Sequence, residues 1–351
     1  IRRLRGRHGV CAMILTRLWR TRRAGRLNGC KRQQVRQDKM AHVEQNVPFA
    51  IALKLASVTM FVVMASLIKA GSAEVPGGEA VFFRSFFALL VIVVWLVAKG
   101  DFPGGIATQD KVGHAARGII GTFAMLCMFT ALGMLPLPEV TAIGYAAPLL
   151  TVILAAMFLG EQVRVFRLAA VALGMFGVLI ILGPRLSAFS GDTVEKTAAL
   201  GAMLVLTGAL CAALAQIYIR KLVATEQTSA IVFYFSVTSA FLSLLTLPFG
   251  WVIPTWTEAG LLVTAGLLGG IGQIFLTTSY RFADTSVIAP FEYTSILLAV
   301  AAGYWLFNEV PTSTTLAGVG LVILAGLIII YRERQLGLER AKQRKVMTPQ
   351  G

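Results

Sequence analysis

Two ionisable residues, Arg84 and Glu292, lie deep inside apolar stretches of the sequence. Arg84 interrupts "EAVFFRSFFALL", and Glu292 stands between Phe291 and Tyr293, two residues after Pro290. A charge in hydrocarbon is costly, so such residues usually bind a polar ligand group, relay a proton or hold another side chain. For Arg84, substrate contact and a structural role, either holding backbone carbonyls or extending to the interface, are both open. For Glu292 we favour function, because a proline, a carboxylate and aromatic rings coincide.

Aromatic and amide side chains, together with these two charged residues, form a candidate ligand site. Tyr145, Phe291 and Tyr293 offer flat faces for stacking, and Gln273 can both donate and accept hydrogen bonds. A pocket of this kind suits a flat, mostly uncharged metabolite that needs a few directed hydrogen bonds. The predicted binding residues are Arg84, Tyr145, Gln273, Phe291, Glu292 and Tyr293.

Five further residues are candidates for gating or coupling. Glu139 lies near the start of the fourth apolar run, and Glu161 and Glu309 close the fourth and ninth runs. A structural cap and a gate partner are the roles open to the last two carboxylates. Pro148 and Pro290 each free a backbone carbonyl and bend a helix, which hydrocarbon tolerates only where the freed group faces protein or a cavity. These bends are predicted to let each half of the protein rock.

The sequence lacks the common catalytic motifs that would indicate an enzyme. The sequence lacks the G-x-x-x-x-G-K-[ST] phosphate loop, the H-E-x-x-H zinc motif and the G-x-S-x-G nucleophile elbow. His114, at the start of the third apolar run, is expected to be an interface histidine rather than a proton relay. The four cysteines show no metal-like pairing. We therefore predict no enzymatic activity, no metal and no cofactor.

Composition indicates that a membrane positions these residues. Only 14% of the 351 residues are charged and 56% are hydrophobic, with a mean hydropathy of +0.75, whereas soluble proteins contain about 25% charged residues. Apolar runs of roughly 20 residues, each long enough to cross about 30 Å of hydrocarbon, recur at 48–70, 79–98, 113–133, 137–159, 164–183, 197–219, 228–249, 259–280, 285–307 and 312–331. The predicted fold class is an all-α polytopic membrane protein with ten transmembrane helices.

Lysine and arginine residues indicate the orientation of these helices. One set of alternate connections holds Lys99, Lys111, Arg117, Arg164, Arg167, Arg220, Lys221 and Arg281. The opposite set holds only Arg185 and Lys196. Cytoplasmic loops carry the excess of positive charge, so both termini are predicted to be cytoplasmic. Lys54 and Lys69, toward the ends of the first run, are expected to be snorkelling anchors, with a Lys69–Glu74 pair as an alternative.

A duplication organises the chain. The segment that contains Tyr145 and Glu161 returns 148 residues later, which places Tyr145 on Tyr293 and Glu161 on Glu309. Each copy contains five apolar runs, and a repeat with an odd number of spans must enter the membrane from the opposite face. Two inverted halves around a central cavity are typical of secondary transporters.

The N-terminal segment differs from the rest of the chain. Residues 1–39 contain 13 Lys and Arg against one acid, Asp38. A polybasic tail at an anionic leaflet or nucleic acid is one interpretation, and residues upstream of a true start at Met40 are another. We expect disorder here and no nucleic-acid partner. The predicted domains are a basic cytoplasmic tail at 1–47, five-helix repeats at 48–183 and 197–331, and a cytoplasmic tail at 332–351.

Two stretches resemble a known family. "PLPEVTAIGYAAPLLTVILAAMFLGEQV" followed by "LAAVALGMFGVLIIL", with a second copy that ends "FNEVP", is similar to the EamA-type repeat of the drug/metabolite transporter superfamily. The resemblance covers nearly everything from Pro48 to Tyr331 and implies a ten-helix carrier in the bacterial inner membrane. Members of this family move amino acids, nucleoside-like metabolites, cofactors and drugs.

Within that family, the first two apolar runs resemble those of proteobacterial riboflavin importers. Riboflavin uptake is therefore the favoured function, and an exporter of amino acids or other metabolites, or an S-adenosylmethionine carrier, is the alternative. Outside transport, the competing class is a membrane scaffold or receptor, which would need no charged or bent groups at depth. The expected partners are a small-molecule substrate and the lipid bilayer, for a monomer or a homodimer.

Overall fold

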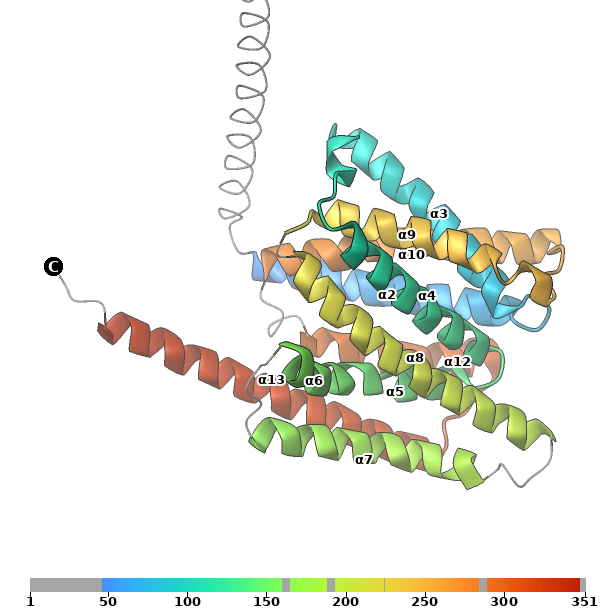
Figure 1. Ribbon diagram of the computed structural model, residues 1–351. Helices are drawn as coiled ribbons and strands as arrows, with labels where there is room; N and C mark the ends of the chain where they lie inside the picture. Colours follow the sequence, from blue (N-terminus) through green and yellow to red (C-terminus); the bar gives the residue numbers. More distant parts are fainter. Residues whose placement is uncertain (1–45, 160–164, 188–192, 224, 284–288, 348–351) are drawn as a thin grey trace, which may run out of the picture. The chain divides into compact units, whose positions relative to one another are not determined.

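The computed structural model of the chain describes residues 46–159, 165–187, 193–223, 225–283 and 289–347 (Figure 1). The chain divides into two units, Ile1–Asn46 and Val47–Gly351, and the helices described below belong to the second. The basic segment 1–39, for which the sequence predicts disorder, and the candidate gate residue Glu161 lie outside the described residues.

The described ranges are built from helices, and no strand occurs in them. In hydrocarbon each backbone N–H and C=O must find a partner inside the protein, which a helix supplies within one segment. The α-helices are α2 (Val47–Gly71), α3 (Gly77–Ala98), α4 (Lys111–Leu132), α5 (Leu137–Gly144), α6 (Ala146–Leu159), α7 (Val165–Ser187), α8 (Thr193–Val223), α9 (Thr228–Leu244), α10 (Trp256–Phe282), α12 (Thr294–Phe307) and α13 (Ser313–Met347). Short 3₁₀ helices are η1 (Gly104–Ile106), η3 (Leu247–Phe249) and η4 (Ala289–Tyr293).

Seven helices in the described part of the chain are long and apolar enough to cross a membrane. Three shorter apolar helices, Leu168–Pro184, Thr228–Leu244 and Phe291–Phe307, accompany them. Large apolar side chains stand exposed along α3, including Leu90 at 54% and Val94 at 61%, as expected for a surface that faces lipid. The chain is thus a helical, multi-pass membrane protein, and the count of ten transmembrane helices stays a prediction.

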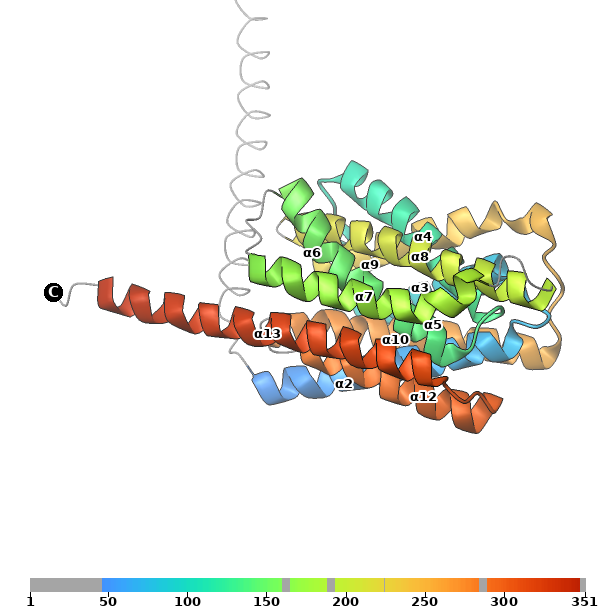
Figure 2. The same cartoon turned by 90° about the horizontal axis from the view of Figure 1, so that it is seen from below.

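Helices of the two halves contact one another in a reciprocal pattern. The first helix of each half, α2 or α8, packs against the third helix of the other, α10 or α4. The second helix of each half, α3 or α9, packs against the same third helices, α10 or α4. The last helices, α7 and α13, lie side by side in both views, at the lower edge of Figure 1 (Figures 1 and 2). The largest cluster of buried apolar residues accordingly includes both halves, with Ile68 from α2 and Leu262 from α10.

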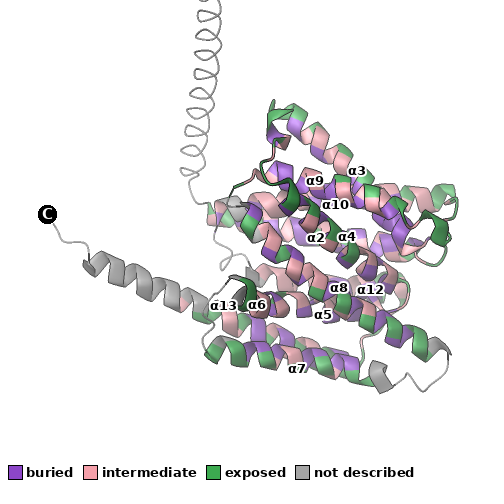
Figure 3. Cartoon of the chain, viewed as in Figure 1, coloured by how far each residue is buried: buried purple, intermediate pink, exposed green. Residues whose placement is uncertain are grey.

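Two glycines bring α7 and α13 into backbone contact. A Cβ atom added at Gly177 would lie 2.7 Å from the carbonyl oxygen of Gly318, and one added at Gly318 would lie 2.6 Å from the carbonyl oxygen of Gly177. Only glycine fits at both positions, as is common where membrane helices approach closely. Figure 3 shows the consequence of such packing, with buried residues along the facing sides of the helices and exposed residues on their outer sides.

The fourth apolar segment is broken in its middle. Helix α5 ends at Gly144 and α6 begins at Ala146, so the break falls on Tyr145, whose N–H bonds to the carbonyl of Ala142 at 3.3 Å. Pro148 explains the break, because it has no N–H to donate to the carbonyl of Gly144, four residues earlier.

The equivalent segment of the second half changes from 3₁₀ to α-helix at the equivalent residue. The 3₁₀ helix η4, which contains Pro290, ends at Tyr293, and α12 begins at Thr294. Tyr293 is the residue that the duplication aligns with Tyr145, although Pro290 and Pro148 do not align. The α-helix of each half is therefore interrupted at the same tyrosine, by a turn in the first half and by a 3₁₀ helix in the second, with prolines at different positions.

Candidate functional site

The two helix breaks meet through their tyrosines. The ring centroids of Tyr145 and Tyr293 are 5.2 Å apart, at an interplanar angle of 35°. The Tyr145 hydroxyl donates to the carbonyl oxygen of Glu292 at 2.9 Å and also hydrogen-bonds with the Ser295 hydroxyl. Tyr145 is buried, so these contacts are formed inside the protein. We call Tyr145, Glu292, Tyr293 and Ser295 the tyrosine cluster, and it joins the first half of the chain to the second.

A partly buried ion pair joins α2 to the tyrosine cluster. The Lys54 ammonium pairs with the Glu292 carboxylate, and their side chains are 1% and 45% exposed, respectively. The ammonium is tolerated at this depth because a carboxylate compensates its charge. The prediction that Lys54 is a snorkelling anchor is therefore wrong. Its side chain extends inward to the other half of the chain, where the carboxylate lies.

Two other predicted binding residues lie close to this cluster. Phe291 is half-buried in η4, directly before the cluster. Gln273 is half-buried on α10, and the carbonyl of the adjacent Gly272 accepts a 2.8 Å hydrogen bond from Ser57. Ser57 is one helical turn beyond Lys54 on α2. Gln273 therefore lies near the level of the ion pair along α2.

Arg84, the remaining predicted binding residue, has a different set of neighbours. Its side chain is 5% exposed, and its guanidinium carbon is 5.5 Å from the ring centre of Phe235 on α9. Arg117 of α4, which is 7% exposed, lies over the same ring at 3.6 Å. We call Arg84, Arg117 and Phe235 the arginine cluster.

The arginine cluster is distant from the tyrosine cluster along helix α2. A Cβ atom at Gly269 of α10 would lie 3.3 Å from Arg84 Nε and 2.8 Å from the sulfur of Met64 on α2. Met64 follows Lys54 by ten residues, which is about 15 Å along an α-helix. The six predicted binding residues therefore do not form one compact pocket, because Arg84 stands apart from the others.

Arg117 is not among the predicted site residues. The loop-charge pattern predicts a loop position for it, whereas the structure places it within α4 with a buried side chain. The available signal was local: small residues flank it in "AARGIIG", which leaves space for a long side chain against neighbouring helices.

At the far end of α2, a carboxylate again links the two halves. Asn308, with a positive φ of 54°, ends α12 and turns the chain so that Glu309 follows. One oxygen of Glu309 lies 2.9 Å from the Lys69 ammonium, and the other accepts a 2.9 Å hydrogen bond from the Leu137 N–H. The first turn of a helix offers unpaired N–H groups and partial positive charge. Glu309 therefore caps α5 from the other half of the chain.

Lys69 differs from both predicted roles. It is 11% exposed and donates to the carbonyl oxygens of Leu132 and Leu135 in addition to its pair with Glu309. Neither a snorkelling anchor nor a pair with Glu74 describes this geometry. Glu139 is also buried and lies in the first turn of α5, close to the same end of the helix.

At the opposite end of the helices, Glu226 holds the loop that precedes α4. It lies between α8 and α9 and accepts hydrogen bonds from the N–H groups of Gln109 and Asp110, at 2.7 and 2.9 Å, and from the Thr108 hydroxyl. Burial alone raises the pKa of Glu226, but these hydrogen bonds outweigh it and lower the pKa below its ordinary value. His114, expected at the interface, is buried and lies 3.8 Å from Glu226.

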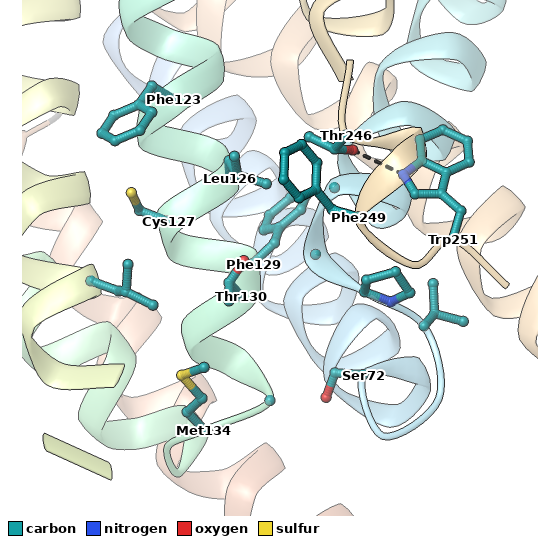
Figure 4. A pocket seen from close by; sticks show the side chains of 16 residues that line it. Ser72, Phe123, Leu126, Cys127, Phe129, Thr130, Met134, Thr246, Phe249 and Trp251 are labelled. Carbon is teal, nitrogen blue, oxygen red and sulfur yellow. Dashed lines mark hydrogen bonds between the residues drawn. The ribbon is translucent and has the colours of Figure 1, made fainter. Parts of the chain in front are cut away.

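A cavity of about 570 Å³ lies beside the start of α3 (Figure 4). Its walls are mostly apolar and come from α3, α4, α8 and the connection between α9 and α10. Trp251 donates to the Thr246 hydroxyl at 2.9 Å on one side, and Cys127 stands on another. The predicted binding residues do not line this cavity. Within the described ranges, no group of three His, Cys, Asp or Glu side chains is placed to hold a metal ion.

Comparison with known proteins gives a consistent result. The EamA-like transporter family matches residues 48–183 and 199–332 of the chain. The pseudopaline exporter CntI of Pseudomonas aeruginosa is 32% identical over 287 residues, which cover 80% of this chain and 95% of that protein. The S-adenosylmethionine uptake transporter of Rickettsia prowazekii is 28% identical over 257 residues, which cover 73% and 84%. A solved crystal structure shares the fold, with a TM-score of 0.59 at 18% identity over 82% of this chain and 98% of that one.

Proposed function

Because the chain belongs to the EamA-like transporter family, within the drug/metabolite transporter superfamily, we propose that it moves a small amino-acid-derived metabolite across the bacterial inner membrane by alternating access. The family and the relatives are transporters rather than enzymes. The relatives are named for pseudopaline and S-adenosylmethionine, which supports the alternative cargoes over riboflavin. Riboflavin uptake, which the resemblance of the first two apolar runs favours, is not supported by the names of these relatives.

Alternating access follows from an inverted repeat, which we propose for residues 48–183 and 197–331. The reciprocal helix contacts support it, since α2 and α8 each pack on the third helix of the other half. The tyrosine contact carries the proposal furthest, because it joins two broken helices at aligned residues. A broken helix can change its bend at little cost, so the two halves can move against each other at this contact.

The described conformation fits a carrier that is open toward the cytoplasm. Loop charges support the predicted orientation, with both termini cytoplasmic. In that orientation the Glu309–Lys69 contact closes the extracytoplasmic end. Glu292 lies toward the cytoplasmic end with its side chain 45% exposed, as expected of a group that solvent or substrate reaches in this state.

Counterflow in proteoliposomes tests the proposed function. Purified full-length protein would be reconstituted and assayed for exchange of labelled S-adenosylmethionine, amino acids and riboflavin. We expect exchange of S-adenosylmethionine or an amino acid above that of protein-free liposomes. Exchange of riboflavin without exchange of any amino-acid-derived solute would overturn the proposed cargo. Rates equal to those of protein-free liposomes for every solute would contradict transport of this class.

Replacing Gly326 of α13 by alanine is expected to displace Tyr293 from the tyrosine cluster. The Tyr293 hydroxyl occupies the space that a Cβ atom at Gly326 would need, whereas nothing lies within 4 Å of the same position at Gly320. Overpacking of this kind costs about 1–3 kcal/mol. We expect Gly326→Ala to lower the unfolding temperature and to slow exchange, and Gly320→Ala, on the same helix, to leave both unchanged. Normal exchange by Gly326→Ala would show that the position of Tyr293 is irrelevant to transport.

A further inference from the structure

Two arginines are buried side by side in the arginine cluster. Arg84 and Arg117 are 5% and 7% exposed, and both lie over the ring of Phe235. Two like charges in a medium of low dielectric repel each other and lose their hydration. The cation–π contacts with Phe235 offset only part of this penalty. An arrangement of this kind is stable when an anion lies between or beside the two guanidinium groups.

Three buried nitrogens of these guanidinium groups lack a hydrogen-bond acceptor among the residues that the structure describes. They are Arg84 Nε, Arg117 Nε and Arg117 Nη1. The ion pairs of lysine or arginine found among the described residues involve Lys54 and Lys69. The donors of the arginine cluster are therefore available to a ligand.

The cluster lies near the middle of the membrane. Arg84 is seven residues into α3 and Arg117 is six residues into α4, or about 10 Å from the start of each helix. Because α3 and α4 are consecutive and enter from opposite faces, the two side chains converge on Phe235 from opposite ends. Both helices have 22 residues, about 33 Å, so the convergence lies at mid-depth, where carriers of this architecture bind solutes.

Glycines hold both side chains in place. A Cβ atom at Gly121 would lie 2.9 Å from Arg117 Nη1, and one at Gly269 would lie 3.3 Å from Arg84 Nε. Gly121 is on α4 of the first half and Gly269 is on α10 of the second. Arg117 is thus packed against the backbone of its own helix, and Arg84 is packed against the backbone of α10 from the second half.

We propose that Arg84 and Arg117 form a binding site for the carboxylate of the transported solute. This inference rests on the proposed function and narrows it to solutes that carry a carboxylate. A guanidinium group matches a carboxylate through two parallel N–H···O bonds, and two such groups can hold both of its oxygens. Phe235 packs against both cations.

Binding of succinate to the purified full-length protein in nanodiscs tests this site without requiring transport. Unfolding temperature would be followed against succinate and against succinamide, which has the same length but no charge, at constant ionic strength. We expect succinate, and not succinamide, to stabilise the protein. Equal effects of the two compounds, or no effect of either, would overturn the proposal.

Two substitutions separate a ligand site from a structural ion pair. Arg84→Gln and Arg117→Gln are each expected to weaken succinate binding about tenfold or more, through loss of charge-assisted hydrogen bonds. Without succinate, each variant should be at least as stable as the parent, because a buried uncompensated charge is removed. Lys99→Gln, which removes an exposed cation from the end of α3, should change neither property.

A lower unfolding temperature of both arginine variants without succinate would instead indicate an acid elsewhere in the chain as the permanent partner, and would overturn the ligand site. If the parent protein binds succinate and the arginine variants do not, but the parent exchanges no solute, the carboxylate site stands and only the transport assignment is rejected.

Discussion

Replacing Glu292 by glutamine is expected to destabilise the protein more than replacing its partner Lys54 by methionine. The two side chains differ in exposure, at 1% for Lys54 and 45% for Glu292. Glu292→Gln leaves a buried ammonium without this carboxylate, which costs about 3 kcal/mol. Lys54→Met leaves a carboxylate that solvent already reaches, and it adds an apolar side chain of similar length to a buried position, so a smaller loss is expected.

The prediction is measured as the unfolding temperature of the purified variants in nanodiscs. The double variant Lys54→Met/Glu292→Gln serves as the control, because it removes both charges and should be more stable than Glu292→Gln alone. Equal losses for the two single variants, or no recovery in the double variant, would show that the ion pair does not govern stability here. The pair would then be a contact formed without net benefit, as many ion pairs are.

The Glu292→Gln variant also distinguishes solute binding from proton coupling in transport. If the Glu292 carboxylate carries a coupled proton, Glu292→Gln should exchange solute across the membrane but fail to accumulate it against a gradient. The exposure of Glu292 permits proton exchange with water, and its bond to Lys54 links its charge state to α2. Accumulation at the parental level by Glu292→Gln would exclude this carboxylate as the coupling group.

Much of the tyrosine cluster could be predicted from the sequence, because its members follow one another in the chain or align in the duplication. Glu292 and Tyr293 are adjacent, and Tyr145 is the repeat equivalent of Tyr293. Proline chemistry further predicts a break close to each tyrosine. These signals are local or periodic in the sequence, so they can be detected without the three-dimensional structure. The helical class follows in the same way from the length and composition of the apolar runs.

The partners of the lysines and of Arg117 could not be predicted, because they depend on how the two halves pack. Lys54 pairs with a carboxylate 238 residues away in the chain. Rules for loop charge treat a lysine or arginine near a helix end as an interface residue, yet a long side chain can also bend inward and be buried. Which of these occurs is decided by the side chains on the neighbouring helix. Arg117 was assigned to the wrong environment for this reason.

The last prediction concerns the contact that closes the end of α2. Glu309→Ala removes the pair with Lys69 and the cap on Leu137, both of which join the second half to the first. The loss of a charge-assisted hydrogen bond and of a mostly buried ion pair costs about 3 kcal/mol. We expect the substitution to destabilise the described conformation relative to an opened state, because the opened state would lack these contacts already. Glu74→Ala, at an exposed acid near the same end, is the matched control.

Cys127 reports on this opening, because it is 3% exposed and lines the same cavity as Ser72, whose hydroxyl donates to the Lys69 carbonyl. With Cys11, Cys30 and Cys211 replaced by serine, the rate of maleimide labelling measures how often the cavity opens. A shift of 1.4 kcal/mol toward the open state raises its population about tenfold, so Glu309→Ala should label at least about tenfold faster than the parent, and Glu74→Ala at the parental rate. If Glu309→Ala unfolds at a lower temperature but labels Cys127 no faster, the carboxylate is a cap for α5 and takes no part in closing this end of the protein.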